Sequence, residues 1–282
     1  MGTICAAAVV SHQPGIMLPQ EARSARGGRD TTLVAGFDQM RAALTAADVD
    51  TLVILDTHWF TTGAHVVAGQ DRYQGIYTSD ELPQLITDYA FDFPGAPDLA
   101  AHVGDVGRER ELPVLNATNP HIAMQYPTLN LVHYLGQGEG VMRVSICQHA
   151  ESHNFVQLGE VLAEAVARSD RRVAILASGG MSHRFPTLDN AAKHRAYSPE
   201  HVITPEARAF DEQVLAWWAA GDHAAVFAAL PDYHQHKPEG MFGHYLAMAG
   251  ALGGADWQAP GRLMSEYENA LGTGQVHVWF DL

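Results

Sequence analysis

Short runs of apolar, mostly β-branched residues alternate along this chain with segments whose apolar residues recur at helical spacing. The runs at residues 4–10, 51–56, 141–146 and 173–177 are typical of strands that are buried on both faces. The run at 275–280 alternates in polarity and predicts a last strand near the C-terminus. The chain therefore supplies several candidate strands for one central sheet.

Helices are predicted between these strands. Asp30 or Thr31 can cap a helix in which apolar residues, beginning with Leu33, recur at i, i+3 and i+4. The repeated strand–helix order predicts an α/β fold: a single domain, residues 1–282, with a mainly parallel central sheet covered by helices on both faces. Other helical patterns occupy residues 98–110, 128–136, 155–168, 205–220 and 241–252.

Two segments rich in proline, glycine or both, 92–98 and 185–205, are predicted to be long loops within this domain. Loops of that length in a compact domain are often functional lids. The second loop contains Lys193 and Arg195, which put positive charge into an otherwise acidic chain. We therefore expect residues 185–205 to form a wall or lid over a ligand-binding pocket.

Composition narrows the function classes. The 282 residues include 17 Lys and Arg against 32 Asp and Glu, a formal charge of −15, so binding to nucleic acid is disfavoured. No uncharged apolar stretch approaches the roughly 20 residues that span a bilayer, and no basic segment precedes the apolar N-terminal run, so a cytoplasmic protein without a membrane partner is expected. Cys5 and Cys147 are too few for a disulfide framework and are predicted to be buried thiols.

The chain has 16 histidines, nearly as many as its lysines and arginines together. His12, His58 and His183 each follow a predicted strand closely, and the fourth strand leads toward His149 and His153. In parallel α/β sheets, ligands bind beyond the carboxyl ends of the strands. These histidines are therefore predicted to converge on one site.

Two imidazoles and one carboxylate on one face of a metal form the arrangement of non-haem Fe(II) oxygenases. Glu266 and Glu268 are the candidate carboxylates, and spacing alone does not separate them. His149 and His153 do not form an H-E-x-x-H zinc motif, and Ser182 lacks a G-x-S-x-G context. A zinc-dependent hydrolase and a non-catalytic binding protein of the same fold stay open as alternatives.

Five further motifs lie along the chain, at residues 11–14, 49–59, 77–83, 176–185 and 272–276. Together they resemble one family, the class III extradiol ring-cleaving dioxygenases of the protocatechuate 4,5-dioxygenase superfamily. The resemblance extends over nearly the whole chain and is strongest for the members that act on 3,4-dihydroxyphenylacetate.

The resemblance implies a role for particular residues. The iron ligands of the family fall on His12, His58 and Glu266, the last selected by its place six residues before the terminal glycine turn. The acid/base of the family falls on His183, whose side-chain type titrates near neutral pH. Another active-site histidine of some members falls on His121.

The implied activity is Fe(II)-dependent cleavage of a catecholic aromatic acid with O2 to a muconic semialdehyde, with 3,4-dihydroxyphenylacetate as the first candidate substrate. Protocatechuate, gallate, a 2,3-dihydroxyphenylpropionate and 2-aminophenol are alternative substrates. Arg184 and Arg195 are candidates to bind the substrate carboxylate, and His153 is a further substrate-binding candidate. A homo-oligomer is expected.

Overall fold

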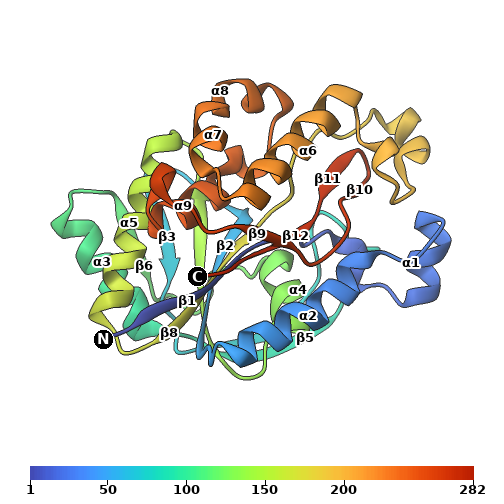
Figure 1. Ribbon diagram of the computed structural model, residues 1–282. Helices are drawn as coiled ribbons and strands as arrows, with labels where there is room; N and C mark the ends of the chain where they lie inside the picture. The colour runs from blue at the N-terminus through green and yellow to red at the C-terminus, as the bar shows by residue number, and fades with distance from the viewer.

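The computed structural model describes residues 1–282 and contains an eight-stranded sheet with the strand order β6-β3-β7-β2-β8-β1-β12-β9 (Figure 1). The four strands predicted from apolar runs form the middle of this sheet, where β7, β2, β8 and β1 pair in parallel. Their bounds are β1 Thr3–Val10, β2 Thr51–Thr61, β7 Gly140–Cys147 and β8 Arg172–Ser178.

Shorter strands complete both edges, so the sheet is mixed but mostly parallel, which confirms the predicted fold class. β12 (His277–Phe280) pairs antiparallel with β1, and β9 (Gly261–Leu263) pairs antiparallel with β12. The opposite edge, β3 (His65–Ala68) and β6 (Val114–Ala117), escaped prediction because four residues give too short a pattern. Two separate hairpins pair β4 (Arg72–Tyr77) with β5 (Tyr89–Pro94) and β10 (Glu268–Ala270) with β11 (Thr273–Gln275).

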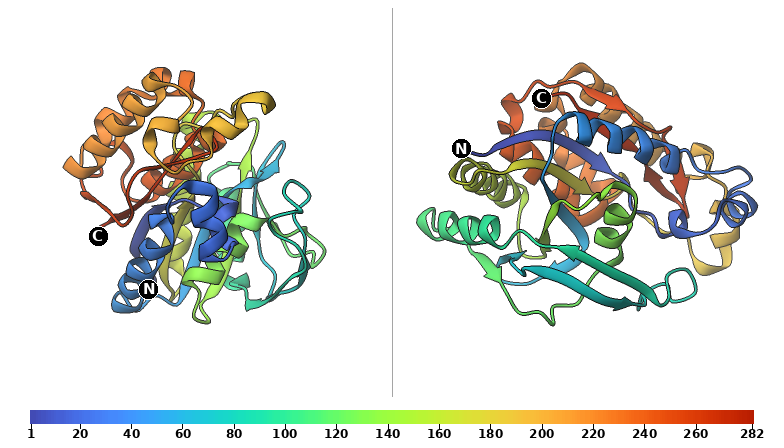
Figure 2. Two further views of the ribbon diagram at one scale, coloured as in Figure 1. Left: turned by 90° about the vertical axis from the view of Figure 1, so that its right-hand side faces the viewer. Right: turned by 90° about the horizontal axis from the view of Figure 1, so that it is seen from below.

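Helices cover both faces of the sheet, as predicted (Figures 1 and 2). Successive side chains of a strand point to opposite faces. Accordingly, Ala7 and Val9 of β1 belong to a 39-residue core with α3, α5 and α9, whereas Ala6 and Ala8 belong to a 23-residue core with α2 and α4. The helices are α1 Gln20–Gly27, α2 Thr32–Ala46, α3 Pro97–Glu109, α4 Tyr126–Leu135, α5 Ser152–Arg168, α6 Pro205–Ala220, α7 His223–Ala228, α8 Leu230–Tyr233 and α9 Gly243–Ala251.

Some predicted boundaries were wrong. The segment 92–98 is not a long loop, because β5 runs to Pro94 and α3 begins at Pro97. The helix predicted to begin at residue 241 begins at Gly243, since Met241 and Phe242 have φ angles of 59° and 60°, outside the right-handed helical region.

The predicted loop 185–205 contains only short 3-10 helices, η2 (Leu188–His194) and η3 (Pro199–His201), before α6. Thr31 rather than Asp30 is the cap of α2, and its side chain accepts a hydrogen bond from the Leu33 amide. No helix of this structure combines the length and the apolar character needed to cross a membrane. Both cysteines are free; Cys147 is buried, whereas Cys5 is only partly buried.

Candidate metal centre and active site

His12 lies just beyond the carboxyl end of β1 and is held there from two sides. Its Nδ1 is 2.9 Å from the hydroxyl of Ser178 at the end of β8, and its carbonyl accepts a hydrogen bond from Asn130 of α4. With Nδ1 engaged, Nε2 is left to face the carboxylate of Glu239, 3.2 Å away. His12 is 3% exposed, so this nitrogen points into the protein rather than into solvent.

His58 is carried by a bulge within β2, not by the loop after it. Asp56 pairs with Ser145 of β7 while Phe60 pairs with the next residue, Ile146, so residues 57–59 are extra residues on β2. A carboxylate oxygen of Asp56 accepts a hydrogen bond from the His58 amide and stabilises the bulge. Bulges of this kind redirect side chains. The His58 ring lies 5.1 Å from that of His12.

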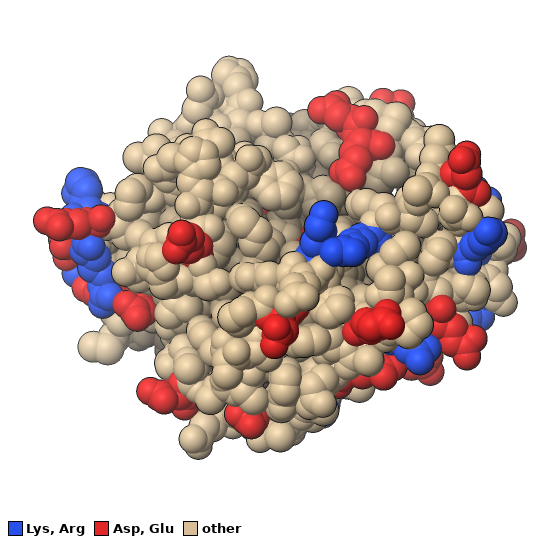
Figure 3. Space-filling view, turned by 90° about the horizontal axis from the view of Figure 1, so that it is seen from above, with Lys and Arg blue, Asp and Glu red and all other residues tan.

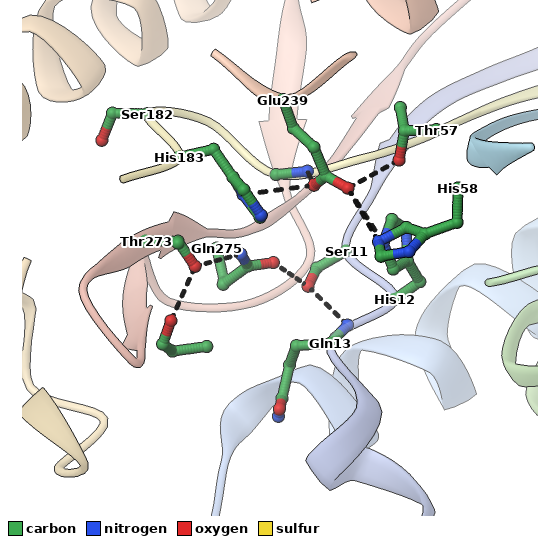
Figure 4. Close-up of polar contacts among 12 residues, drawn as sticks. Ser11, His12, Gln13, Thr57, His58, Ser182, His183, Glu239, Thr273 and Gln275 are labelled. Carbon is green, nitrogen blue, oxygen red and sulfur yellow. Dashed lines mark hydrogen bonds and ion pairs between the residues drawn. The ribbon is translucent and has the colours of Figure 1, made fainter. Parts of the chain in front are cut away.

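Glu239 reaches the two histidines from a distant part of the chain (Figure 4). Its segment runs antiparallel to the residues that follow β8: Pro238 forms a bridge with Ser182, and the Glu239 amide donates to the carbonyl of Met181. The left-handed residues 240–242 then turn the chain into α9. Backbone in this unfavourable region persists where surrounding structure enforces it, commonly at functional sites.

The carboxylate of Glu239 is 6% exposed and lies among polar groups. One oxygen is 3.3 Å from His58 Nε2 and accepts a hydrogen bond of 2.6 Å from the Thr57 hydroxyl. The other accepts a hydrogen bond from the Gly180 amide. Burial acts to raise the pKa of Glu239, but His183, His12 and His58 outweigh it and hold the pKa well below its ordinary value, so the group is ionised.

This geometry corrects the assignment of Glu266. The Glu266 side chain is 65% exposed and pairs with Arg29 at 2.8 Å, away from the two histidines. Glu268 is buried, but it accepts hydrogen bonds from Thr31 and Thr32 at the start of α2. Both glutamates therefore belong to the region where the C-terminal hairpin meets α2, and spacing from the glycine turn misplaced the site carboxylate.

The donor set of His12, His58 and Glu239 fits a metal ion. One ligand atom from each residue lies within 4.8 Å of the others, and the two donor types suit non-haem iron. The remaining nitrogen of each histidine has an outer partner, Ser178 for His12 and Glu81, at 3.1 Å, for His58. Such outer partners orient metal-ligating imidazoles.

His58 has a second polar neighbour. The hydroxyl of Tyr126 lies 2.9 Å from the same Nε2 that faces Glu239. Burial acts to lower the pKa of His58, but its contacts with Glu239 and Glu81 raise it to about 10. The protein thus holds a positive charge between these carboxylates, which a metal cation could replace.

His183 follows Gly179 and Gly180, which connect it to β8. A Cβ at Gly179 would lie only 2.7 Å from the ring of His244, so the segment passes where a side chain would not fit. His183 Nδ1 is 3.4 Å from Glu239 but makes no hydrogen bond. Burial lowers the pKa of His183, which favours a neutral imidazole that can accept a proton.

A cavity of about 970 Å³ opens over these residues. Phe60, Phe185, Leu188 and Leu271 line it and are exposed in part, so its walls are largely apolar. Its lining also includes three basic residues, Arg26, Arg195 and Lys237. Figure 3 shows acidic side chains scattered over one face of the molecule, with a small basic group near its middle.

The structure brings together only some of the predicted site residues. His12, His58, His183 and Arg195 line the cavity. The others point elsewhere for simple reasons: the exposed His121 lies beyond the edge strand β6, the exposed His153 lies on α5 near Glu151, and Arg184 donates to the carbonyl of Gln235. The fourth strand end, with His149, likewise contributes nothing to the cavity.

The sequence interpretation missed Glu239, Thr57, Glu81 and Tyr126. Thr57 and Glu81 lie within motifs that had been recognised, but their roles depend on contacts with Glu239 and His58. For Glu239 the local signal was weak: an acidic residue between Pro238 and a glycine, directly before an apolar run. That pattern is equally typical of an exposed helix start.

Comparison with known proteins places this geometry in context. Residues 6–281 match the family described as the catalytic LigB subunit of aromatic ring-opening dioxygenase. The chain is 29% identical to 3,4-dihydroxyphenylacetate 2,3-dioxygenase of Escherichia coli over 258 residues, covering 90% of this chain and 91% of that protein. It is 24% identical over 296 residues to the 2-aminophenol 1,6-dioxygenase beta subunit of a Pseudomonas species, covering 100% and 95% of the two chains.

Among solved structures, an uncharacterized protein from Escherichia coli K12 shares the fold with a TM-score of 0.66 at 18% identity, covering 98% of this chain and 99% of that one. The family match extends over nearly the whole chain and includes the His-His-Glu group and the adjoining histidine. The protein therefore belongs to the LigB family of catalytic subunits of extradiol, aromatic ring-opening dioxygenases.

Proposed function

We propose that residues 1–282 form one Fe(II)-dependent catalytic unit that opens the ring of a catecholic aromatic acid with O2 to a muconic semialdehyde. His12, His58 and Glu239 would hold the metal. The observation that carries this proposal is the buried Glu239 carboxylate, which faces both imidazoles and has a His183 nitrogen without a hydrogen bond 3.4 Å away. The similarity to the Escherichia coli enzyme makes 3,4-dihydroxyphenylacetate the first candidate substrate.

When bound, Fe(II) supplies a Lewis acid that acidifies the catechol hydroxyls and a route for electrons from the ring to O2. His183, neutral and lining the cavity, accepts a hydroxyl proton from the substrate and returns a proton later in the reaction. The apolar walls at Phe60, Phe185 and Leu271 contact the ring and limit access of water. Tyr126, beside His58, adds a hydroxyl that can hydrogen-bond to a substrate oxygen.

We further propose that Arg195 and Arg26 bind the substrate carboxylate. Both line the cavity, and neither forms an ion pair with a carboxylate of this chain. The buried Tyr197 connects their segments, because its amide donates to the carbonyl of Gly27 and its ring lies against that glycine. Arg184 is exposed and does not line the cavity, so it is the weaker candidate.

The wall that carries Arg195 is ordered by hydrogen bonds. The side-chain amide of Asn269 donates to the carbonyls of His194 and Ala196 at 2.8 and 2.7 Å, and the Asn269 backbone amide donates to Tyr197. Gln13 lines the same cavity; it is 8% exposed and its amide nitrogen has no hydrogen-bond partner. An unused donor of this kind is suited to an anionic ligand.

A catechol panel tests the activity. Protein loaded anaerobically with Fe(II) would be mixed in air with 3,4-dihydroxyphenylacetate, protocatechuate, gallate, a 2,3-dihydroxyphenylpropionate, 2-aminophenol and 4-methylcatechol, with O2 uptake and visible absorbance recorded. We expect O2 consumption and a coloured semialdehyde, with 3,4-dihydroxyphenylacetate preferred and no turnover in the zinc-loaded protein. Stoichiometric iron without O2 uptake on any member of the panel would refute the dioxygenase assignment.

Charge neutralisation tests the carboxylate site. Arg195→Gln and Arg26→Gln should each lower kcat/KM for 3,4-dihydroxyphenylacetate about 10- to 100-fold, since a hydrogen bond to a charged group contributes about 1.5–3 kcal/mol. The same variants should leave 4-methylcatechol nearly unaffected. Lys193→Gln is the matched control, because Lys193 lies on the same segment but does not line the cavity. Equal losses for the two substrates would exclude carboxylate recognition by these arginines.

A further inference from the structure

A second buried carboxylate lies behind the active site, and the proposed chemistry does not use it. Asp211 of α6 is 0% exposed. It accepts hydrogen bonds from the Ser182 amide at 3.0 Å, the Ser182 hydroxyl at 2.7 Å, the Tyr233 hydroxyl at 2.8 Å and the Tyr267 hydroxyl at 2.6 Å. All of these donors are neutral groups, so the charge of Asp211 is held by hydrogen bonds alone.

The arrangement favours the ionised form of Asp211. The Ser182 amide can only donate, and the three hydroxyls donate to the carboxylate as well. Burial raises the pKa of Asp211 to about 6, although its hydrogen bonds act to lower it, so the carboxylate is the main form at neutral pH. Burying a charge without a neighbouring cation destabilises the fold, and the hydrogen bonds to Asp211 must offset this desolvation.

The partner that matters for function is Ser182, because the next residue is His183. The backbone around Ser182 is held by its neighbours: Met181 donates to the carbonyl of Gly274, Gly274 donates to Ser182, and His183 donates to Lys237. A Cβ at Gly274 would lie 2.3 Å from the carboxylate of Asp211, so the glycine makes room for this contact. The backbone of residues 181–183 is therefore held by three parts of the chain: Asp211 of α6, Gly274 of β11 and residues 237–239.

His183 has few side-chain contacts of its own. Its Nδ1 makes no hydrogen bond and lies 3.4 Å from Glu239, and the aromatic ring packed against it is that of Phe185, which is itself 58% exposed. The direction of the imidazole therefore depends largely on the backbone that carries it. We propose that Asp211 is a positioning residue, which fixes the Ser182 peptide and so aims His183 at the substrate. This inference rests on the proposed role of His183 in proton transfer.

The first test is Asp211→Asn, which keeps the shape but turns one acceptor into a donor that faces other donors. We expect kcat to fall about 10- to 100-fold, the usual scale for a misplacement of about 1 Å, while KM and iron content stay unchanged. Glu212→Gln, at the adjacent and exposed position of α6, is the control and should have no effect. Tyr267→Phe keeps the carboxylate and removes one donor, so it should show a smaller loss of kcat even if the asparagine variant folds poorly.

A double variant separates positioning from general stability. If Asp211 acts through His183, then Asp211→Asn should cause no further loss of kcat in a His183→Gln background, because the two effects share one cause. If Asp211→Asn lowered kcat by the same factor in the parent protein and in His183→Gln, the proposal would be overturned.

A spectroscopic test does not need turnover. The imidazole resonance that disappears in His183→Gln would be followed in the iron-free protein. It should shift in Asp211→Asn and stay in place in Glu212→Gln, whether or not the proposed activity is found. An unmoved resonance in Asp211→Asn would refute the positioning role, whereas full activity of His183→Gln would instead refute the proposed role of His183.

Discussion

Three glutamates, Glu239, Glu266 and Glu268, should respond to the same Glu→Gln substitution in three different ways. Only Glu239 faces His12 and His58, so Glu239→Gln should remove bound iron and with it nearly all ring cleavage. Glu266→Gln should leave both iron content and stability nearly unchanged. Glu268→Gln should keep iron but destabilise the fold.

The stability effects follow from exposure and hydrogen bonding. The Glu266 side chain is 65% exposed and has one ion pair, which contributes about 0–1 kcal/mol to the free energy of unfolding. The Glu268 side chain is 1% exposed and accepts from Thr31 Oγ1, Thr32 N and Thr32 Oγ1 at 2.6, 2.8 and 2.9 Å. Losing one or two charge-assisted bonds costs about 3 kcal/mol. That loss corresponds to a melting temperature lower by roughly 6–12 °C.

The assay combines metal analysis, thermal unfolding and O2 uptake on the three variants and the parent protein after identical anaerobic loading with Fe(II). Full iron occupancy in Glu239→Gln together with loss of iron in Glu266→Gln would refute the assignment. Loss of iron in Glu268→Gln at temperatures well below its unfolding transition would show that the α2 contacts of Glu268 also support the metal site.

The other predictions test parts of the same structure. Gly240→Ala should lower the melting temperature and kcat together, because φ is 54° there and the new Cβ would lie 2.8 Å from Thr57 Cγ2; unchanged values in calorimetry and O2 uptake would contradict this. Glu81→Gln should weaken iron binding about 10- to 100-fold in a chelator competition, the usual effect of losing an outer partner of a metal ligand, and equal affinity would exclude that role. Burial lowers the pKa of His277 to about 3, so between pH 6.5 and pH 3 the unfolded state binds a proton at His277 and the folded state does not. The free energy of unfolding should therefore fall on acidification, by about 2 kcal/mol at pH 5 from this group. The slope of unfolding free energy against pH should therefore be shallower in His277→Gln, and an identical slope would reject the argument.

The sequence by itself determined the fold class and the inner strands of the sheet. Apolar runs depend only on the local chain, and they located the inner strands and the side of the sheet where functional residues gather. His12 and His183 could be placed from sequence because the carboxyl ends of parallel strands share one edge. His58 was also identified, but its position on a bulge was not, since a bulge depends on pairing with β7.

Only the tertiary structure decided which carboxylate completes the site. Glu239 arrives through antiparallel pairing between residues 237–239 and 181–183, and no periodic pattern encodes a contact between such distant segments. Spacing alone did not separate Glu266 from Glu268, yet Glu266 is exposed and Glu268 accepts hydrogen bonds at the start of α2, because the C-terminal hairpin packs against that helix. The sequence pattern reports burial and period within a segment, whereas a metal centre depends on how several segments meet.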